Sequence, residues 1–356
     1  MDDMSTITAN PDLLRELIAG GLAGALLGDA MGCVTEQLTP AQIANRYGRV
    51  TTLLAPADGT FAHGRLPGEL TDDGLLTLSV FDAIITGGGT ITIADVAQLL
   101  LDWACDPDLL ARFAGPSSRR AIELLQAGAD PYQAGAPDPM NNDLRISNGA
   151  AMKAAPAGWA SPDDQLRAAL LATRISAPTH NSDISYSGAA AIATAVSSAA
   201  AGAEPLAILA AARAGCEEGL RLAAGNAVAV PGASISARLL IAGEIAAADA
   251  DEHHRFTRLA AVFGNGLPVT EAVPMAIGAF LIFPEDPMRM LTEIVNVGGD
   301  ADTIASIAGA IAGTHCGITA FPTSLIAQLE KVNSLSIRQQ AEKMAHIVQT
   351  KDVRIQ

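Results

Sequence analysis

The sequence predicts an all-α fold, and three observations lead to this prediction. Apolar residues recur at helical spacing along most of the 356 residues. Strand patterns are nearly absent, and the best candidate, residues 50–54, is short and isolated. Alanine and glycine are abundant whereas aromatic residues make up only 4% of the chain. Small side chains must therefore fill the core, which favours helices in close contact.

The predicted helices follow one another along the whole chain. No segment has the composition of a linker, so we expect a single domain over residues 1–356 with its core at about 12–348. The stretches 55–70 and 127–142 are rich in Pro, Gly and Asp and long for loops in a compact domain, so we expect active-site loops there. Helices are predicted near residues 11–31, 72–87, 93–104, 117–127, 145–155, 162–177, 183–201, 204–223, 233–248, 252–263, 269–282, 286–295, 301–317 and 335–348.

The charge and cysteine content exclude several classes of protein. With 22 Lys and Arg against 38 Asp and Glu the net charge is −16, so we expect neither a nucleic-acid nor a membrane partner. No apolar stretch convincingly reaches the roughly 18–20 residues of a membrane span. The acidic N-terminus does not resemble a signal peptide. Four scattered cysteines without a CxxC pair are typical of a reduced, cytoplasmic protein.

Two sets of glycines recur at helical spacing, each beside an acidic motif. Glycine costs about 1 kcal/mol in a helix interior, and close contact between helices would offset this cost. No strand precedes the first set, so a nucleotide-binding glycine loop is a weak interpretation. We predict that the two glycine helices pack at the centre of the fold and carry the acidic motifs together. The sets are Gly21, Gly24, Gly28 and Gly32, and Gly309, Gly313 and Gly317.

The two acidic motifs indicate a metal site. Each combines two carboxylates with a threonine hydroxyl at a predicted helix start, where a single such motif is also common as an ordinary cap. Four carboxylates in one site would repel one another unless cations neutralised them. Oxygen-only ligands favour Mg²⁺, Mn²⁺ or Ca²⁺ over zinc. The motifs are Thr71-Asp72-Asp73 and, after a Gly-Gly turn, Asp300-Ala301-Asp302-Thr303.

Six runs of the sequence, in this order, resemble the motifs of the ADP-ribosylglycohydrolase family. They extend from about residue 15 to 320, and the combination is specific although no single run is. The chain departs from the family pattern at Gly74, where a hydroxyl residue is frequent, and at Lys153, where arginine is frequent. The runs are GLAGALLGDAMGCVTE (21–36), GELTDDGLLTL (68–78), GPSSRRAIELL (115–125), SNGAAMKAAPAG (147–158), ATRISAPTHNS (172–182) and GGDADTIASIAGAIAGTHCG (298–317).

The resemblance implies a compact orthogonal multi-helix bundle with two divalent cations, Mg²⁺ or Mn²⁺, at its centre. It assigns Glu36 to catalysis or to a loop beside the site, whereas Asp29 is expected to be structural and hydrogen-bonded nearby. The predicted helix start near Ser147 would expose N–H groups to an anionic ligand. The implied metal ligands are Thr71, Asp72, Asp73, Asp300, Asp302 and Thr303, and the implied substrate-binding residues are Ser147, Asn148, Gly149, Ala150, Ala151 and His180.

These inferences lead to the hypothesis of a metal-dependent hydrolase that cleaves a ribosyl glycosidic bond. The expected substrate is an ADP-ribosylated protein or a small ribosylated molecule. A carboxylate would guide the attacking water while an oxocarbenium-like centre develops on the sugar. Either Glu36 or Asp302 fits this catalytic role.

Three alternatives remain at this point. The first is the same reaction on a nucleoside-like N-riboside, because few aromatic residues are available to stack an adenine. The second is a non-enzymatic, crystallin-like relative, which should have lost metal ligands. The third is a two-metal phosphohydrolase, against which the order of the motifs argues. The aromatic candidates for stacking are Phe61, Trp103, Phe113, Tyr132 and Tyr186.

Overall fold

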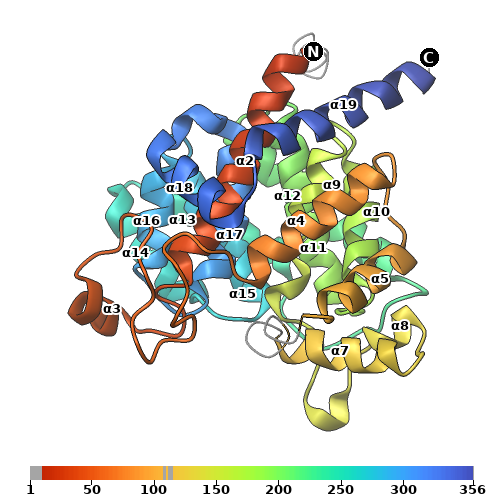
Figure 1. Cartoon of the computed structure of the whole chain (residues 1–356). Helices are drawn as coiled ribbons and strands as arrows, with labels where there is room; N and C mark the ends of the chain where they lie inside the picture. Colours follow the sequence, from red (N-terminus) through yellow and green to blue (C-terminus); the bar gives the residue numbers. More distant parts are fainter. Residues whose placement is uncertain (1–9, 107–109, 111–114, 356) are drawn as a thin grey trace.

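The chain folds into packed helices (Figure 1), and the all-α prediction is confirmed. The computed structural model describes residues 10–106, 110 and 115–355. Within these residues there is no strand, only three isolated β-bridges. The α-helices are α2 (Pro11–Gly32), α3 (Pro40–Tyr47), α4 (Asp72–Thr86), α5 (Ile93–Trp103), α7 (Pro116–Gln126), α8 (Pro131–Ala134), α9 (Ala155–Trp159), α10 (Gln165–Ser176), α11 (Asp183–Ala200), α12 (Pro205–Ala223), α13 (Ile235–Ala246), α14 (Glu252–Phe263), α15 (Val269–Ile282), α16 (Pro287–Val295), α17 (Ala301–Cys316), α18 (Thr323–Asn333) and α19 (Ile337–Ile355), and the 3₁₀ helices are η1 (Pro139–Asn141), η2 (Asn148–Ala150) and η3 (Ile318–Ala320).

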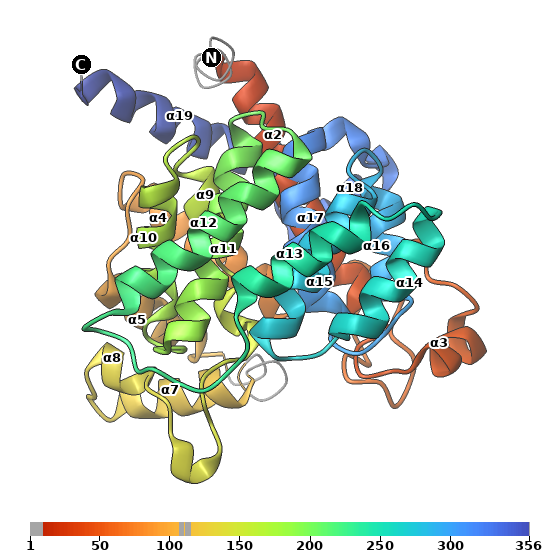
Figure 2. The ribbon, with the colours of Figure 1, turned by 180° about the vertical axis from the view of Figure 1, so that it is seen from behind.

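Helices α2 and α17 lie between two groups of helices. Helices α4 and α9–α12 pack on one side, and α13–α16 pack on the other, as the two opposite views in Figures 1 and 2 show. Almost every residue of α17 and of α2 after its first turns is buried. In the described part of the chain, none of the helices is both long and apolar enough to cross a membrane.

The glycines bring α2 and α17 into backbone contact. A Cβ added to Gly24 would lie 2.1 Å from the carbonyl oxygen of Gly309. One added to Gly28 would lie 2.3 Å from the carbonyl oxygen of Ala305, so no side chain fits at either position. Gly21 lies to the side of this backbone contact, because its added Cβ would meet side chains, the hydroxyl of Thr314 in α17 at 2.1 Å and Trp159 Nε1 at 2.6 Å, whereas one added to Gly20 would lie 2.2 Å from the carbonyl oxygen of Gly313. The predicted pairing of the two glycine helices is therefore confirmed, with Gly20 in the place expected for Gly21.

We expect Gly24→Ala to destabilise the protein by about 3 kcal/mol, near the upper end for overpacked cores, because the obstacle is backbone rather than a movable side chain. Chemical denaturation of the two proteins measures this difference. Gly115→Ala is the matched control, since a Cβ there would meet nothing within 4 Å. An equal loss of unfolding free energy in both variants would contradict the proposed contact.

The predicted helix at 145–155 is wrong. The segment instead forms the short η2, a turn, and then α9 from Ala155. Pro156 has no N–H to donate to the carbonyl of Met152, and the hydroxyl of Thr77 donates there instead, at 3.1 Å. The N–H of Asn148 is also taken, because it donates to the carbonyl of Leu267 at 2.8 Å. Tertiary partners thus replace the helical bonds that the local pattern predicts.

The strand candidate at 50–54 is also wrong, since these residues pair with no other strand. Val50 instead exchanges two hydrogen bonds with the Asn296 side chain, at 3.0 and 2.8 Å. Four of the described α-helices were not predicted: α3, α8, α18 and, beyond its first residue, α9. Helix α3 begins with a complete capping box between Thr39 and Gln42, but it is short and buries only Ile43.

Candidate functional site

The fold brings the two acidic motifs together. Asp72 and Asp73 begin α4, and Asp300 and Asp302 begin α17, about 230 positions further along the chain. The hydroxyl of Thr303 joins the two motifs directly by donating to Asp73 Oδ2 at 3.1 Å. Within the described residues, two groups of carboxylates have oxygen atoms within 4.8 Å of one another and so could hold a metal ion. These groups are Asp29, Asp73 and Asp302, and Glu36, Asp300 and Asp302.

Asp29 orients the start of α4. Its Oδ1 accepts the hydroxyl of Thr71 at 2.5 Å, and its Oδ2 accepts the N–H groups of Thr71 and Gly74, both at 3.0 Å. Three of the roughly four acceptor positions of this carboxylate are therefore occupied. This agrees with the expected structural role of Asp29. Gly74 departs from the family pattern for a visible reason, because a Cβ there would lie 2.5 Å from Asp29 Oδ2.

The loop that carries Glu36 is tied to the loop before α17. The N–H of Gln37 donates to the carbonyl of Gly299 at 2.7 Å, and the N–H of Gly299 donates to the carbonyl of Leu38 at 3.1 Å. Gly298 has φ +75° and approaches Leu38 so closely that a Cβ would lie 1.9 Å from its carbonyl oxygen. The Gly-Gly turn thus serves the close approach of two backbones, which places Glu36 beside the second acidic motif.

Asn265 is a positioning residue that the sequence did not reveal. Its carbonyl accepts the N–H of Asp300 at 2.7 Å, and its side-chain amide donates to the carbonyl of Gly298. An added Cβ on Gly299 would lie 2.1 Å from the carbonyl oxygen of Asn265. A single asparagine in a loop carries no periodic signal, so only the assembled fold shows that it fixes the start of α17.

Two carboxylate oxygens in the cluster, Asp73 Oδ1 and Asp302 Oδ1, are buried and have no hydrogen-bond partner among the residues that the structure describes. An unsatisfied buried acceptor costs about 1–3 kcal/mol, and more when it is charged. A bound cation would satisfy both oxygens. The chemistry of this donor set, with carboxylates and hydroxyls and no thiol or imidazole in either group, fits a hard divalent cation.

The carboxylates also disturb one another electrostatically. Burial, followed by repulsion from Asp300 and Asp72, raises the pKa of Glu36 to about 8. Burial, followed by repulsion from Asp29, raises the pKa of Asp72 to about 7. Burial, followed by repulsion from Glu36, raises the pKa of Asp302 well above its ordinary value. The cluster therefore favours either bound protons or bound cations.

Three of the predicted substrate-binding residues, Ser147, Asn148 and His180, form a wall beside this cluster. The amide of Asn148 donates to Asp300 Oδ2, and Ser147 Oγ lies 2.7 Å from His180 Nε2. Of the predicted set only Ser147 is partly exposed; the others are buried. The helix start that was expected to bind an anion is absent, because η2 has three residues and the N–H of Asn148 is already paired.

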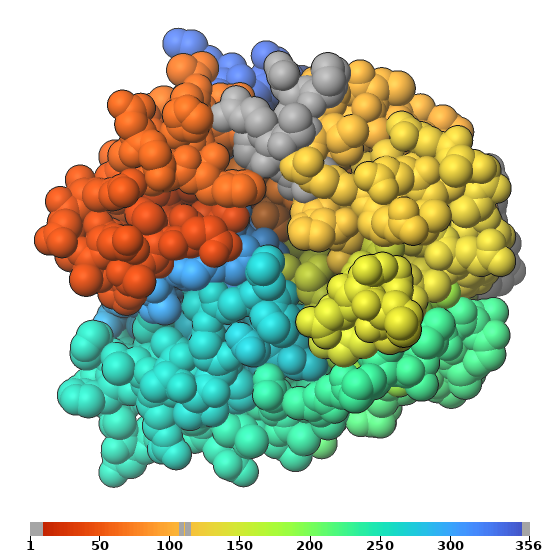
Figure 3. Space-filling model, turned by 90° about the horizontal axis from the view of Figure 1, so that it is seen from below, coloured from red at the N-terminus to blue at the C-terminus, as the bar shows by residue number. Residues whose placement is uncertain are grey.

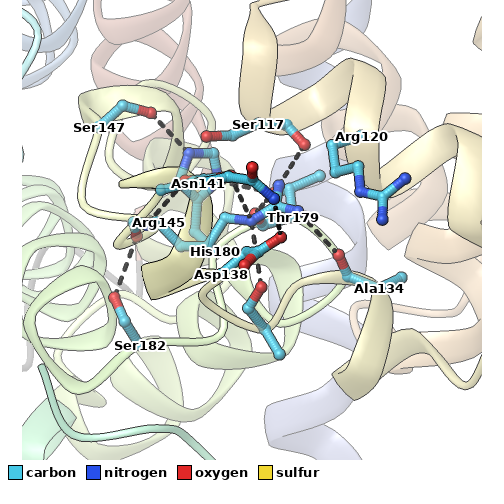
Figure 4. Close-up of polar contacts among 12 residues, drawn as sticks. Ser117, Arg120, Ala134, Asp138, Asn141, Arg145, Ser147, Thr179, His180 and Ser182 are labelled. Atoms are coloured by element: carbon cyan, nitrogen blue, oxygen red, sulfur yellow. Dashed lines mark hydrogen bonds and ion pairs between the residues drawn. The ribbon is translucent and has the colours of Figure 1, made fainter.

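Arg145, which the sequence analysis overlooked, holds this wall in place (Figure 4). It is 1% exposed, and its guanidinium donates to the carbonyl groups of Ser117, Ala134, Ala136 and Thr179. Its Nε lies 3.0 Å from Asp143 Oδ2, and its own carbonyl accepts the hydroxyl of Ser182 at 3.0 Å. One buried arginine thus connects α7, the loop before Ser147 and the loop before His180.

Two of the aromatic candidates for stacking, Tyr186 and Trp103, are engaged elsewhere in the fold. Tyr186 is buried and donates its hydroxyl to Asn181 Oδ1 at 2.9 Å. Trp103 lines a separate groove of about 560 Å³ between α4 and α5, which contains none of the predicted site residues. Phe61 is 55% exposed, and Phe113 lies outside the described residues.

The face shown in Figure 3 has a central hollow. It is bordered by segments coloured red to orange, yellow and cyan, which correspond to residues of the N-terminal loops, to the region around 115–145 and to that around 265. The blue of the segment near residue 300 is visible at its floor. The two long loops predicted at 55–70 and 127–142 thus belong to segments that surround the hollow, while their function stays a prediction.

Comparison with known proteins agrees with this architecture. The family model described as ADP-ribosylglycohydrolase matches residues 10–354. The chain is 32% identical over 343 residues to the uncharacterized protein YegU of Escherichia coli (strain K12), covering 95% of this chain and 98% of that protein. It is 28% identical to ADP-ribosylhydrolase ARH3 of Mus musculus, covering 86% and 85% of the two chains, and 24% identical to ADP-ribosyl-[dinitrogen reductase] glycohydrolase of Rhodospirillum rubrum, covering 91% and 94%.

The fold agrees as well. A solved structure titled ADP-ribosylglycohydrolase-related protein complex aligns with a TM-score of 0.67 and 22% identity, covering 95% of this chain and 98% of that one. The match of the family model over nearly the whole chain, together with the YegU relative, shows the family. The chain belongs to the ADP-ribosylglycohydrolase family.

Proposed function

We propose that this protein is a metal-dependent hydrolase that removes ADP-ribose from a modified protein or small molecule by cleaving a ribosyl glycosidic bond. The observation that carries the proposal is the cluster of carboxylates at the starts of α4 and α17, in a chain that belongs to the ADP-ribosylglycohydrolase family. We further propose that it works in the cytoplasm, which fits four cysteines that are all free.

The proposed cofactors are two divalent cations, Mg²⁺ or Mn²⁺, which would polarise the attacking water and offset the charge that develops as the bond breaks. The unpartnered oxygens of Asp73 and Asp302 and the two groups that share Asp302 support this proposal. The proposed ligands are those that the resemblance implied, Thr71, Asp72, Asp73, Asp300, Asp302 and Thr303. Asp29 would serve mainly by holding the hydroxyl proton of Thr71, which leaves the lone pairs of that oxygen available.

For the carboxylate that guides the water, we propose Glu36. Asp302 belongs to both carboxylate groups and is buried, so we assign it to the cations. Glu36 is only half-buried and lies on a loop at the edge of the cluster, where it can meet a substrate and a water. Its raised pKa suits a group that takes a proton from water and returns it to the leaving group.

A substrate screen tests this function. ADP-ribosyl-arginine, ADP-ribosyl-serine, free ADP-ribose derivatives and simple nucleosides would each be incubated with Mg²⁺ and with Mn²⁺. We expect release of a free ribose end from at least one ADP-ribosyl substrate. Turnover of nucleosides alone would support the N-riboside alternative. Release of inorganic phosphate in place of a ribose end would contradict the glycosidic mechanism.

Removal of metal is expected to lower the melting temperature. A cation that binds only the folded state stabilises it by mass action, and its departure leaves the buried carboxylates to repel one another. At a metal concentration of a hundred times Kd, chelation with EDTA should lower Tm by roughly 5 °C. An unmoved melting curve, in a sample shown by elemental analysis to lose its metal, would refute the buried metal site.

A further inference from the structure

Four side chains form a continuous row of hydrogen bonds beside the carboxylate cluster. Lys153 Nζ donates to Thr179 Oγ1 at 3.2 Å. Thr179 Oγ1 lies 2.8 Å from His180 Nδ1, and His180 Nε2 lies 2.7 Å from Ser147 Oγ. Figure 4 shows the last three of these residues. Lys153, Thr179 and His180 are at most 2% exposed, so their donors and acceptors must be matched within the protein.

Lys153 and the carbonyl of Ser176 together indicate the direction of this row. An ammonium group has three donors and no acceptor, so Thr179 Oγ1 must accept from Lys153. The one proton of Thr179 can then go to His180 Nδ1 or to the carbonyl of Ser176. That carbonyl already accepts the N–H groups of Thr179 and His180, at 3.1 and 2.8 Å, and it lies 3.4 Å from Thr179 Oγ1. Thr179 therefore donates to His180 Nδ1.

The histidine transmits this direction to the serine. With Nδ1 as acceptor, the neutral ring carries its proton on Nε2 and donates it to Ser147 Oγ. A neutral ring fits the surroundings, because burial, followed by the charges of Lys153 and Arg145, lowers the pKa of His180 well below its ordinary value. The backbone of Gly149 packs closely against the His180 ring, because a Cβ added to Gly149 would lie only 2.9 Å from Cε1 of the ring. Ser147 consequently keeps its own hydroxyl proton for another partner.

We propose that Lys153 and Thr179 are positioning residues, which act through His180 to make Ser147 a hydrogen-bond donor to an acceptor oxygen of the substrate. This inference rests on the proposed function, because the acceptor would be a phosphate or ribosyl oxygen of an ADP-ribosyl group. Ser147 is suited to this contact as the partly exposed member of the wall. It would also supply the anion recognition that the absent helix start cannot supply.

The role of Lys153 is specific to this arrangement. It fills one acceptor position of Thr179 Oγ1 and also donates to the carbonyl of Gly149. The positive charge of Lys153 beside Thr179 also favours the Nδ1 lone pair, and not an N–H group, on the side of the ring that faces it. Without that charge, the reversed row would gain population, in which Nδ1 donates to Thr179 Oγ1 and Ser147 donates to Nε2. In that reversed row the Ser147 hydroxyl would donate its proton to His180 Nε2, and it could no longer donate a hydrogen bond to the substrate.

The tautomer of His180 can be measured without any ligand. Histidine ¹⁵N NMR would be recorded for the wild-type protein and for the variants Thr179→Val, Thr179→Ser and Lys153→Met, with His180→Gln identifying the signal among the six histidines. We expect the proton on Nε2 in the wild type and in Thr179→Ser, which keeps the hydroxyl. The Val and Met variants should populate both tautomers. The same tautomer in all four proteins would overturn the proposal.

The second measurement is binding of ADP-ribose to the same metal-loaded proteins by calorimetry. Loss of a hydrogen bond to a charged acceptor should weaken binding about 10- to 100-fold in Thr179→Val, and hardly at all in Thr179→Ser. A loss for ADP-ribose and for ADP but not for adenosine assigns the acceptor to phosphate, and a loss for ADP-ribose alone assigns it to the terminal ribose. Equal affinities of the Val and Ser variants would contradict the donor role. If the wild-type protein itself failed to bind ADP-ribose, the proposed function would fall, while the NMR result would still decide the direction of the row.

Discussion

Asp302→Asn is expected to abolish turnover, with a loss of about 1000-fold or more, and to weaken Mg²⁺ or Mn²⁺ binding measured by calorimetry. The reason is that Asp302 belongs to both carboxylate groups and has a buried oxygen without a partner. Asp73→Asn should act in the same direction, because Asp73 lies across the site on the other motif. Both substitutions keep the size of the side chain and remove one negative charge.

The stability of these variants separates a metal site from an ordinary structural cluster. In EDTA, Asp302→Asn should melt no lower than the wild-type protein, because the substitution relieves repulsion from Glu36 and Asp73. In excess metal, only the wild-type protein should gain the full increase in Tm. Asp249→Asn is the matched control on an exposed residue and should change neither property. Unchanged metal affinity in both cluster variants would show that the two motifs do not share a site.

The centre of the fold could be predicted because its signal is local and repeated. Gly24 and Gly28 recur at helical spacing in α2, and Gly309 and Gly313 do so in α17, the helix that the second acidic motif begins. Glycine destabilises a helix interior, so several glycines on one face indicate that this face packs closely against another helix. The pairing of α2 with α17 follows from this reasoning. The first acidic motif begins α4 instead, and it reaches the cluster because Asp29 of α2 holds the start of that helix, which the glycine pattern does not predict.

The supports of the site could not be predicted, because they depend on contacts between distant segments. Arg145 and Asn265 are single residues in loops, and their partners are mostly backbone carbonyl and N–H groups, which leave no trace in a sequence pattern. The segment 145–155 has a helical pattern, yet Pro156 and the hydroxyl of Thr77 redirect its backbone bonds. Identity of the acids is thus visible in the sequence, whereas the geometry that orients them appears only in the fold.

A substrate with an intact ribose should be cleaved about 100-fold faster, or more, than its 2′-deoxy analogue. A chain with a net charge of −16 and five or more carboxylates at one site offers little attraction for a phosphate or a hydroxyl-rich sugar by itself. Cations held by Asp73, Asp300 and Asp302 would attract such a ligand instead. The vicinal 2′- and 3′-hydroxyls are the neutral oxygens of ribose that can best complete the coordination of these cations. A site built to bind a hydroxyl rejects an analogue that lacks it much more strongly than an apolar pocket rejects a missing methylene. Rates on matched ribosyl and 2′-deoxyribosyl substrates, measured with the same leaving group and saturating Mn²⁺, give the ratio, and the 3′-deoxy compound serves as a second probe of the same pair. Equal rates on the ribosyl and 2′-deoxyribosyl compounds would remove the sugar from the proposed metal site, even if the glycosidic bond is cleaved.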